Sequence, residues 1–308
     1  MITTVTLSPA FDRTYYVDDF NVSGLNRAWQ VKTNMGGKGI NFSSIVSTAG
    51  TPCLATGFLG GGRERFEAFL KDMGVEHDFV NTEGEIRTNI KICDISNDTY
   101  TDLNECTAAV SEKDVKKLYK KVDAACKKNK FLYMGGSVPP GVDSGIYKEL
   151  IEIGKKRGAI TILDASGEAL RLGIEAGPDI IKPNKTEAEE FLGRGIKTLG
   201  DAVSAAKEMM AAGAKTVLLT LGGDGAVCVD KNNCLNALPL CVDVKSTVGA
   251  GDSFLAGFVY GKCKKLGLQA SLKYAVSFST AKIQTEGTDL PSLKELTAYT
   301  PQIIINEL

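Results

Sequence analysis

Short apolar runs alternate along the chain with longer segments in which apolar residues recur every three or four positions. The short runs are typical of buried strands, and the longer period is typical of helices that pack on one face. The expected strands cover residues 2–7, 53–58, 75–80, 131–134, 160–163, 179–181, 216–220 and 241–244, with a hairpin over 226–238. The expected helices cover residues 40–46, 63–73, 112–126, 144–157, 167–172, 201–212, 252–265 and 268–284, and two more begin at 184 and after 291. This alternation predicts an α/β fold built on a parallel sheet.

Two segments interrupt the alternation of strands and helices. Residues 14–32 alternate apolar and polar positions around a Ser-Gly turn, and residues 86–106 do the same around an Asn-Asp turn. Alternation on both sides of a turn predicts a β-hairpin. Two widely separated hairpins in an α/β chain are best explained by a small sheet beside the main one, such as a lid. We therefore expect a single domain over 1–308, with lid strands inserted at about 12–34 and 85–107.

The charges of the chain are balanced, with 36 Lys and Arg against 37 Asp and Glu in 308 residues. Nucleic acid and anionic membranes are therefore not expected as partners, because both attract basic surfaces. No run approaches the length of a membrane span and no basic leader precedes the first strand, so we expect a cytoplasmic protein. The eight cysteines include no C-x-x-C pair and are interpreted as reduced core residues.

Several common kinds of site are disfavoured by the sequence. The only histidine, His77, lies in "GVEHDFV", which favours a strand edge over a zinc ligand or a catalytic base. A P-loop is excluded because Lys38 is followed by Gly39 and no glycine stands at the required distance upstream. A nicotinamide-dependent dehydrogenase is disfavoured because no G-x-G-x-x-G follows the first strand.

Glycine-rich and polar segments follow the expected strands or begin the next helix. Asp12 is expected on the loop beyond the first strand, which Pro9 ends. Because the carboxyl ends of parallel strands share one edge of a sheet, where open α/β proteins bind ligands, these segments should form one site. They are Asp12, Ser137 and the segments 36–38, 184–187, 220–225 and 249–252.

The stretch "STVGAGDS", residues 246–253, is the strongest candidate for chemistry. Gly249 and Gly251 remove side chains that would keep an anion from the backbone, and an apolar helix follows them directly. A glycine turn at a helix N-terminus forms an anion site. Asp252 stands at that helix start, where it is equally well interpreted as an N-cap or as a base aimed at the anion.

Phosphoryl transfer requires such a set of groups: a base for the hydroxyl proton, backbone N–H groups for the moving phosphoryl, magnesium, and cations for any substrate phosphate. Asp252 supplies a base and the amides of 250–252 supply the N–H groups. Glu187 and Asn184, three residues apart at a helix start, supply magnesium donors. Candidate cations for the substrate phosphate are Lys38, Arg27 and Arg87.

The chain resembles the ribokinase-like carbohydrate kinases of the phosphofructokinase B type, and within them the 1-phosphofructokinases. The resemblance runs over essentially the whole length and rests on "TVTLSPAFDRTYYVD", "GGKGIN", "RTNIKI", "GGSVPPG", "LDASGEAL", "IIKPNKTEAEE", "LTLGGDGA" and "STVGAGDSFLAGF". The last of these motifs is specific to that family. Two departures are Ser8, where asparagine is usual, and "GGSVPPG" in place of "SGSLPPG".

The resemblance implies a three-layer α/β/α sandwich with a small β-sheet lid, use of ATP with Mg²⁺, and a homodimer formed through the lid. It implies Asp252 as proton acceptor, with Gly249, Ala250 and Gly251 completing the anion hole. The sugar-binding residues that it implies are Asp12, Gly36, Gly37, Lys38 and Asn41, with Arg27, Arg87 and Ser137 at the substrate phosphate. The implied nucleotide and metal residues are Asn184, Glu187, Thr220, Gly222, Gly223, Asp224 and Gly225.

The first functional hypothesis is ATP-dependent phosphorylation of fructose 1-phosphate at its 6-hydroxyl, giving fructose 1,6-bisphosphate. Tagatose 6-phosphate and fructose 6-phosphate are rival substrates, since they require the same base and anion hole and differ in which end of the sugar meets the cations. A sugar-phosphate-binding regulator without turnover is the non-enzymatic alternative. The presence of Asp252 and Glu187 disfavours it, because a binder needs no base.

Overall fold

Eleven strands form the main sheet of the computed structural model, which describes residues 1–287 and 289–308. Strand β1 (Ile2–Thr6) lies between β4 (Cys53–Gly61) and β9 (Phe131–Gly135) and is parallel to both. The order across the sheet is β15-β14-β13-β12-β11-β10-β9-β1-β4-β5, and β6 also pairs with β4. The remaining strands are β5 (Glu76–His77), β6 (Val80–Glu85), β10 (Ile160–Asp164), β11 (Ile180–Ile181), β12 (Val217–Thr220), β13 (Ala226–Val229), β14 (Cys234–Ala237) and β15 (Ile305–Glu307).

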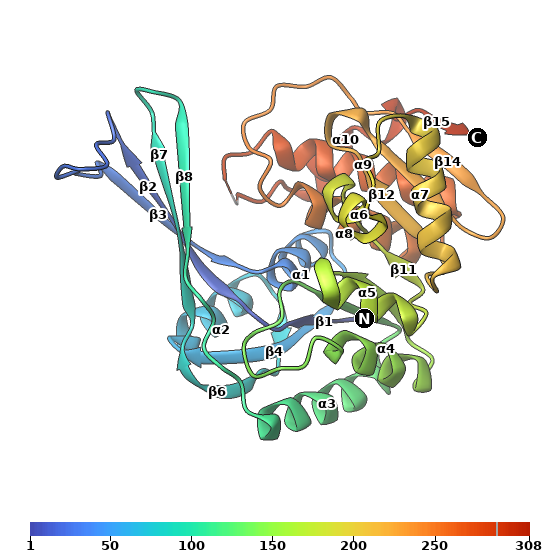
Figure 1. Ribbon diagram of the computed structural model, residues 1–308, viewed down its shortest axis with the longest axis horizontal. Helices are drawn as coiled ribbons and strands as arrows, with labels where there is room; N and C mark the ends of the chain where they lie inside the picture. The colour runs from blue at the N-terminus through green and yellow to red at the C-terminus, as the bar shows by residue number, and fades with distance from the viewer. Residues whose placement is uncertain (288) are drawn as a thin grey trace.

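Helices cover both faces of this sheet (Figure 1). One face packs against α1 (Lys38–Thr48), α2 (Arg63–Asp72), α8 (Ala250–Cys263), α9 (Leu268–Ile283) and α10 (Leu293–Ala298). The other packs against α3 (Glu112–Cys126), α4 (Ile146–Lys156), α5 (Gly167–Glu175), α6 (Lys185–Leu192) and α7 (Leu199–Ala211). Successive side chains of a strand point to opposite faces, so Ile2 enters the first core and Val5 the second. The predicted α/β/α sandwich is confirmed.

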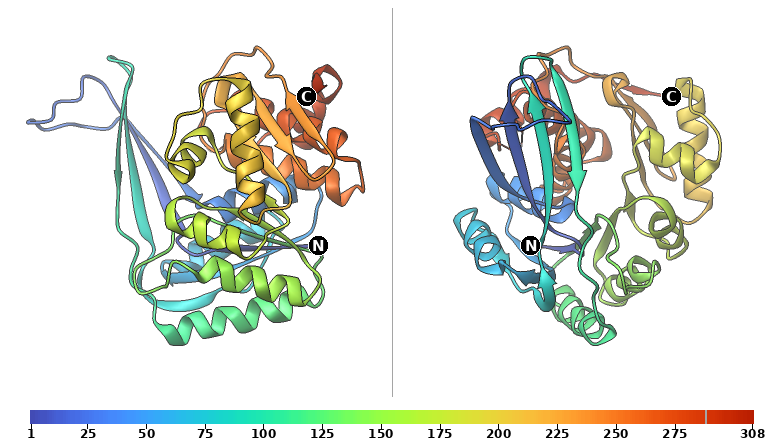
Figure 2. Two further views of the ribbon diagram at one scale, coloured as in Figure 1. Left: turned by 45° about the vertical axis from the view of Figure 1, so that its right-hand side comes forward. Right: turned by 60° about the vertical axis from the view of Figure 1, so that its left-hand side comes forward.

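Four further strands form a second sheet, which we call the small sheet. Its order is β3 (Gln30–Gly36), β2 (Ala10–Val17), β7 (Arg87–Asp94) and β8 (Thr99–Asn104). The pairs β2–β3 and β7–β8 are antiparallel, which confirms both predicted hairpins, and β2 runs parallel to β7. The far end of the small sheet stands clear of the helices in the left view of Figure 2. The chain thus leaves the main sheet twice and returns each time.

Three expectations about local structure are wrong. Residues 241–244 form no strand, because the edge position beside β14 is taken by β15 from the end of the chain. Asp12 lies within β2 and not on a loop, because the chain resumes strand structure directly after Pro9. Cys106 and Cys241 are exposed, so the cysteines are not all core residues, although Cys53 and three others are buried.

Other sequence predictions agree with the fold. His77 lies in β5, at the edge of the main sheet. The helix predicted for 112–126 has those bounds in α3, because Ser111 caps its first turn by accepting from the Asp114 amide. Across residues 1–287 and 289–308, no helix is both long enough and apolar enough to cross a membrane.

Candidate active site

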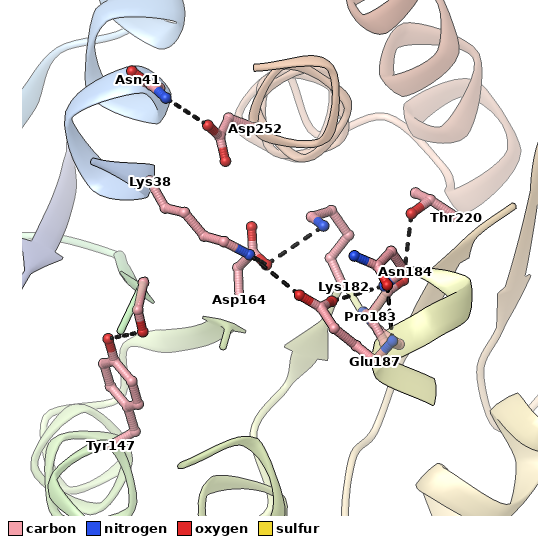
Figure 3. Close-up of polar contacts among 11 residues, drawn as sticks. Lys38, Asn41, Tyr147, Asp164, Lys182, Pro183, Asn184, Glu187, Thr220 and Asp252 are labelled. Atoms are coloured by element: carbon pink, nitrogen blue, oxygen red, sulfur yellow. Dashed lines mark hydrogen bonds and ion pairs between the residues drawn. The ribbon is translucent and has the colours of Figure 1, made fainter. Parts of the chain in front are cut away.

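A buried carboxylate at the end of β10 organises a cluster of charges at the carboxyl edge of the main sheet (Figure 3). Asp164 is fully buried, and its Oδ1 lies 2.7 Å from Lys38 Nζ and 3.4 Å from Lys182 Nζ. Lys38 begins α1, and its ammonium also lies 3.6 Å from Glu187 Oε1. Two strand ends, of β10 and β11, and two helix starts, of α1 and α6, therefore bring two cations and two anions together.

The protonation of this cluster follows from burial and pairing. Burial would raise the pKa of Asp164, but Lys182 and Lys38 outweigh it and hold that pKa below its ordinary value. Burial would lower the pKa of Lys38, but Asp164, Glu187 and Asp252 together raise it above its ordinary value. Asp164 and Lys38 are therefore both charged at neutral pH.

Asp252 lies in the first turn of α8, on the other side of the Lys38 side chain from Asp164 (Figure 3). Its side chain is 8% exposed, and its Oδ2 accepts a hydrogen bond from Asn41 Nδ2 at 2.8 Å. Burial, with a contribution from the negative charge of Asp164, raises the pKa of Asp252 to about 6. A carboxylate with that pKa is ionised at neutral pH yet basic enough to accept a proton, which is the property of a general base.

The turn before Asp252 exposes backbone amides. Gly249 is the N-cap of α8 and has φ 74°, a left-handed conformation that favours glycine. The amides of Gly251 and Asp252 lie in the first turn, where a helix supplies no acceptor of its own. Asp252 itself does not cap the helix, so its interpretation as an N-cap is wrong. The turn can bind an anion beside a base.

A second group of polar residues lies within the small sheet. Asp12 Oδ1 accepts from Asn89 Nδ2 at 2.8 Å, and Asn89 Oδ1 accepts from Arg87 NH1 at 3.2 Å. Burial raises the pKa of Asp12, although its bond to Asn89 opposes this rise. Gly36 lies on the neighbouring strand, where a Cβ atom would overlap the Asp12 carboxylate. Glycine at that position thus leaves room for the acid.

The predicted nucleotide and metal residues also lie at this edge. Asn184 and Glu187 form a capping box at the start of α6: Asn184 Oδ1 accepts from the Glu187 amide at 2.8 Å and Glu187 Oε2 accepts from the Asn184 amide at 2.9 Å. Thr220 ends β12 and bridges to Asn184. The next three predicted residues form a single 3₁₀ turn, Gly222–Asp224, which Gly225 ends with φ 89°.

The structure does not bring the three predicted phosphate-binding cations together. Lys38 joins the cluster around Asp164, whereas Arg87 joins Asp12 through Asn89. Arg27 is exposed on the loop between β2 and β3, at the far end of the small sheet. Ser137 is exposed on the loop after β9, two residues beyond the strand.

Sequence reasoning missed three residues of the site. Neither Asp164 nor Lys182 is among the candidate residues that the sequence indicates. Both follow buried strands at the edge where ligands bind, and a charged residue directly after an apolar run was the signal available. Asn89 is not among those candidates either, and its contact with Asp12 depends on the pairing of β2 with β7.

A cleft of about 870 Å³ lies between the small sheet and the segments around Thr247 and Glu286. Asp12, Asn34 and Asn89 line it from the small sheet. Lys32 Nζ reaches across to Glu286 Oε2 at 3.2 Å. The volume suits a small phosphorylated molecule.

The chain is similar in sequence to known carbohydrate kinases. Residues 5–295 match the model of the pfkB family of carbohydrate kinases. The 1-phosphofructokinase of Rhodobacter capsulatus is 32% identical over 309 residues, which cover 100% of this chain and 98% of that protein. The 1-phosphofructokinase of Haloferax volcanii is 33% identical over 301 residues, covering 96% of this chain and 95% of that protein.

Solved structures agree with these relatives. Phosphofructokinase-2 of Escherichia coli, in complex with potassium, superposes with a TM-score of 0.92 at 28% identity, over 98% of each chain. A possible 1-phosphofructokinase of Thermotoga maritima superposes with a TM-score of 0.90 at 28% identity, over 100% of this chain and 99% of that one. The chain therefore belongs to the pfkB family of carbohydrate kinases, enzymes that transfer a phosphoryl group to an alcohol.

Proposed function

We propose that the protein transfers the γ-phosphoryl group of ATP to the 6-hydroxyl of fructose 1-phosphate, giving fructose 1,6-bisphosphate and ADP. The observation that carries this proposal is the buried Asp252 carboxylate, with a pKa raised to about 6, beside the open amides of the glycine turn. A base and an anion site in one helix turn are what transfer to a hydroxyl requires. The full-length similarity to 1-phosphofructokinases supports the choice of sugar.

In this proposal Asp252 accepts the proton of the 6-hydroxyl as the sugar oxygen forms its bond to the γ-phosphorus. The bond from that phosphorus to the β,γ-bridging oxygen breaks, and ADP leaves with the electron pair. The amides of Gly251 and Asp252 hold the oxygens of the moving group. Lys38, which lies between Asp164 and Glu187, adds positive charge at the same place. Asn41 keeps the carboxylate of Asp252 oriented.

The sugar is proposed to lie in the cleft against Asp12, whose carboxylate Asn89 holds in place. Arg87 is the proposed partner of the substrate phosphate, because Asn89 fixes one edge of its guanidinium beside Asp12. Gly36, Gly37 and Ser137 border the sugar in this proposal. Thr220 and the 222–225 turn border the nucleotide.

Magnesium is the proposed metal, and the donors fit an ion held mostly by water and phosphate oxygens. Across residues 1–287 and 289–308, no three His, Cys, Asp or Glu side chains are grouped closely enough to bind a metal by themselves. Among the described residues, Glu187 Oε1 is engaged only by the 3.6 Å ion pair with Lys38, so Glu187 would hold the ion, with the Asn184 side chain beside it. Bound magnesium would neutralise charge on the nucleotide phosphates.

We also propose that the small sheet is a lid and that two copies pair through its outer face. Val31 and Leu103 are 45% and 62% exposed on the face that lies away from the cleft. Exposed apolar residues on a sheet face mark an interaction surface. Arg27 would contribute to phosphate binding only if such pairing brought its loop to a cleft.

An ADP-release assay with fructose 1-phosphate, fructose 6-phosphate and tagatose 6-phosphate tests the proposed substrate. We expect the highest kcat/KM with fructose 1-phosphate. A clear preference for either 6-phosphate would overturn the choice of sugar but not the phosphotransfer. If Asp252→Asn released ADP as fast as the unmodified protein with every sugar, the proposed base would be wrong.

A further inference from the structure

Lys282, in the last turn of α9, is a buried cation that the proposed mechanism does not use. It is 2% exposed, and lysine is seldom so buried unless a carboxylate pairs with it. Its Nζ donates to the carbonyl oxygen of Gly287 at 2.7 Å and to Thr285 Oγ1 at 3.0 Å. Among the ion pairs of the described residues, none includes Lys282. The ammonium is therefore held by neutral oxygens.

The stem of Lys282 lies directly behind the glycine turn. A Cβ atom at Gly249 would stand 3.3 Å from Lys282 Cε, and a Cβ atom at Gly251 would stand 3.3 Å from Lys182 Nζ. Two buried lysines thus flank the turn. The charge of Lys182 is offset by Asp164, whereas no contacting carboxylate offsets that of Lys282.

The ionisation of Lys282 agrees with this geometry. Burial lowers its pKa to about 8, and the negative charges of Asp289 and Asp252 oppose that decrease. The group is therefore mostly protonated at pH 7. A charge in a dry environment acts more strongly on its surroundings than the same charge in water.

We propose that Lys282 is a positioning residue for phosphoryl transfer, holding a fixed positive charge behind the turn formed by Gly249 and Gly251. This rests on the proposed function, because negative charge builds up on the moving phosphoryl group at that turn. The amides of Lys245 and Ser246 donate to the carbonyl oxygen of Ile283, so the segment before the glycine turn is held to α9 without the Lys282 ammonium.

The first test compares Lys282→Met, which removes the charge and keeps the length, with Lys282→Arg, which keeps the charge. Lys273→Met is the matched control, since Lys273 lies on the same helix about 13 Å away along its axis. We expect Lys282→Met to lower kcat by about tenfold to a hundredfold, less than the ~10²–10³ for a direct donor. KM for the sugar phosphate should stay within about twofold, because the charge acts on the γ-phosphoryl group at the turn and not on the phosphate of the sugar. Lys282→Arg should recover much of the rate, and the control should match the unmodified protein.

Chemical rescue separates a charge effect from a packing effect. Lys282→Ala leaves space beside two oxygen acceptors, so methylammonium should restore its kcat in a saturable way. Methylammonium should not activate Lys282→Met or the unmodified protein. A Lys282→Met protein that is folded by circular dichroism and retains full kcat would overturn the proposal. So would a rate that neither arginine nor methylammonium restores.

A binding measurement keeps this test independent of the choice of sugar. The ratio of the affinity for a nonhydrolysable ATP analogue to the affinity for ADP measures how much the γ-phosphate contributes to binding. The γ-phosphate is the group that should contact the glycine turn. Lys282→Met should lower that ratio, and an unchanged ratio would refute the role of Lys282. Absence of turnover in the unmodified protein with all three sugar phosphates would instead refute the proposed function.

Discussion

If Asp252 accepts the hydroxyl proton, the reaction should slow wherever that carboxylate is protonated. With a pKa of about 6, the group is about nine-tenths ionised at pH 7 and only about one-tenth ionised at pH 5. We therefore expect kcat/KM to fall about tenfold per pH unit below pH 6. An aspartate in water would place that decrease near pH 4.

Removing Asn41 tests whether the contacts of Asp252 set this profile. Asn41 stabilises the ionised carboxylate through a 2.8 Å hydrogen bond, so Asn41→Ala should raise the pKa of Asp252. A hydrogen bond to a charged group contributes about 1.5–3 kcal/mol, which corresponds to roughly one to two pKa units. The acid limb should then move to about pH 7–8, and kcat/KM at pH 7 should fall about twofold to tenfold from this cause alone.

The assay is kcat/KM from pH 5 to pH 9.5, followed by ADP release with the coupling enzymes in excess. Asn41 is also a predicted sugar-binding residue, so its loss can lower kcat/KM by the same factor at every pH. Only a change in the pKa of Asp252 shifts the pH at which kcat/KM begins to fall. Asn232→Ala, in the exposed turn between β13 and β14, is the matched control. An acid limb at the same pH in Asn41→Ala and in the unmodified protein would refute the reasoning. Asp252→Asn should lower kcat by about 10²–10⁴.

Three further predictions concern other parts of the molecule. Arg87→Ala should raise KM for the phosphorylated sugar by about tenfold or more while changing kcat little, as measured by initial rates. For an unphosphorylated sugar, the same substitution should leave KM almost unchanged. Tyr133→Phe should leave the free energy of unfolding in urea unchanged or raise it by up to about 1 kcal/mol, since the buried Tyr133 hydroxyl has no partner among the described residues. Gly257→Ala should lower it by about 1–3 kcal/mol, because the new Cβ would overlap the Tyr274 carbonyl oxygen of α9; a melting temperature equal to that of the unmodified protein would contradict this packing argument.

Most of the fold could be predicted from the sequence because local patterns and long-range packing agree. The segment that became α3 carries both an apolar stripe and a capping serine, and its predicted bounds were correct. Residues 241–244 alternate like a strand but form none. A pattern shows that a segment can pair, whereas only the assembled sheet shows that β15 already occupies the edge.

The sequence indicates which segments lie at the carboxyl edge of the sheet. It does not indicate which of their side chains contact one another. Asp252 and Glu187 were found because they lie in recognisable helix starts. Asp164 and Lys182 were not, because their importance lies in a 3.4 Å ion pair between residues of neighbouring strands. Arg27 stays a predicted phosphate-binding residue, although its loop lies away from Lys38 and Arg87 within one chain.

The hydrogen bond between Asn41 and Asp252 joins residues 211 positions apart, which constrains the order in which the protein is made. At about 5–20 residues per second, roughly 10–40 s separate the synthesis of the two side chains. Strand β1, the first to be made, must likewise wait for β9 before its second edge is paired. During translation its unpaired edge is a site for wrong pairing. Capture of β1 by β4 and α1 covers one edge only, so the other edge should stay open to wrong pairing until β9 is made.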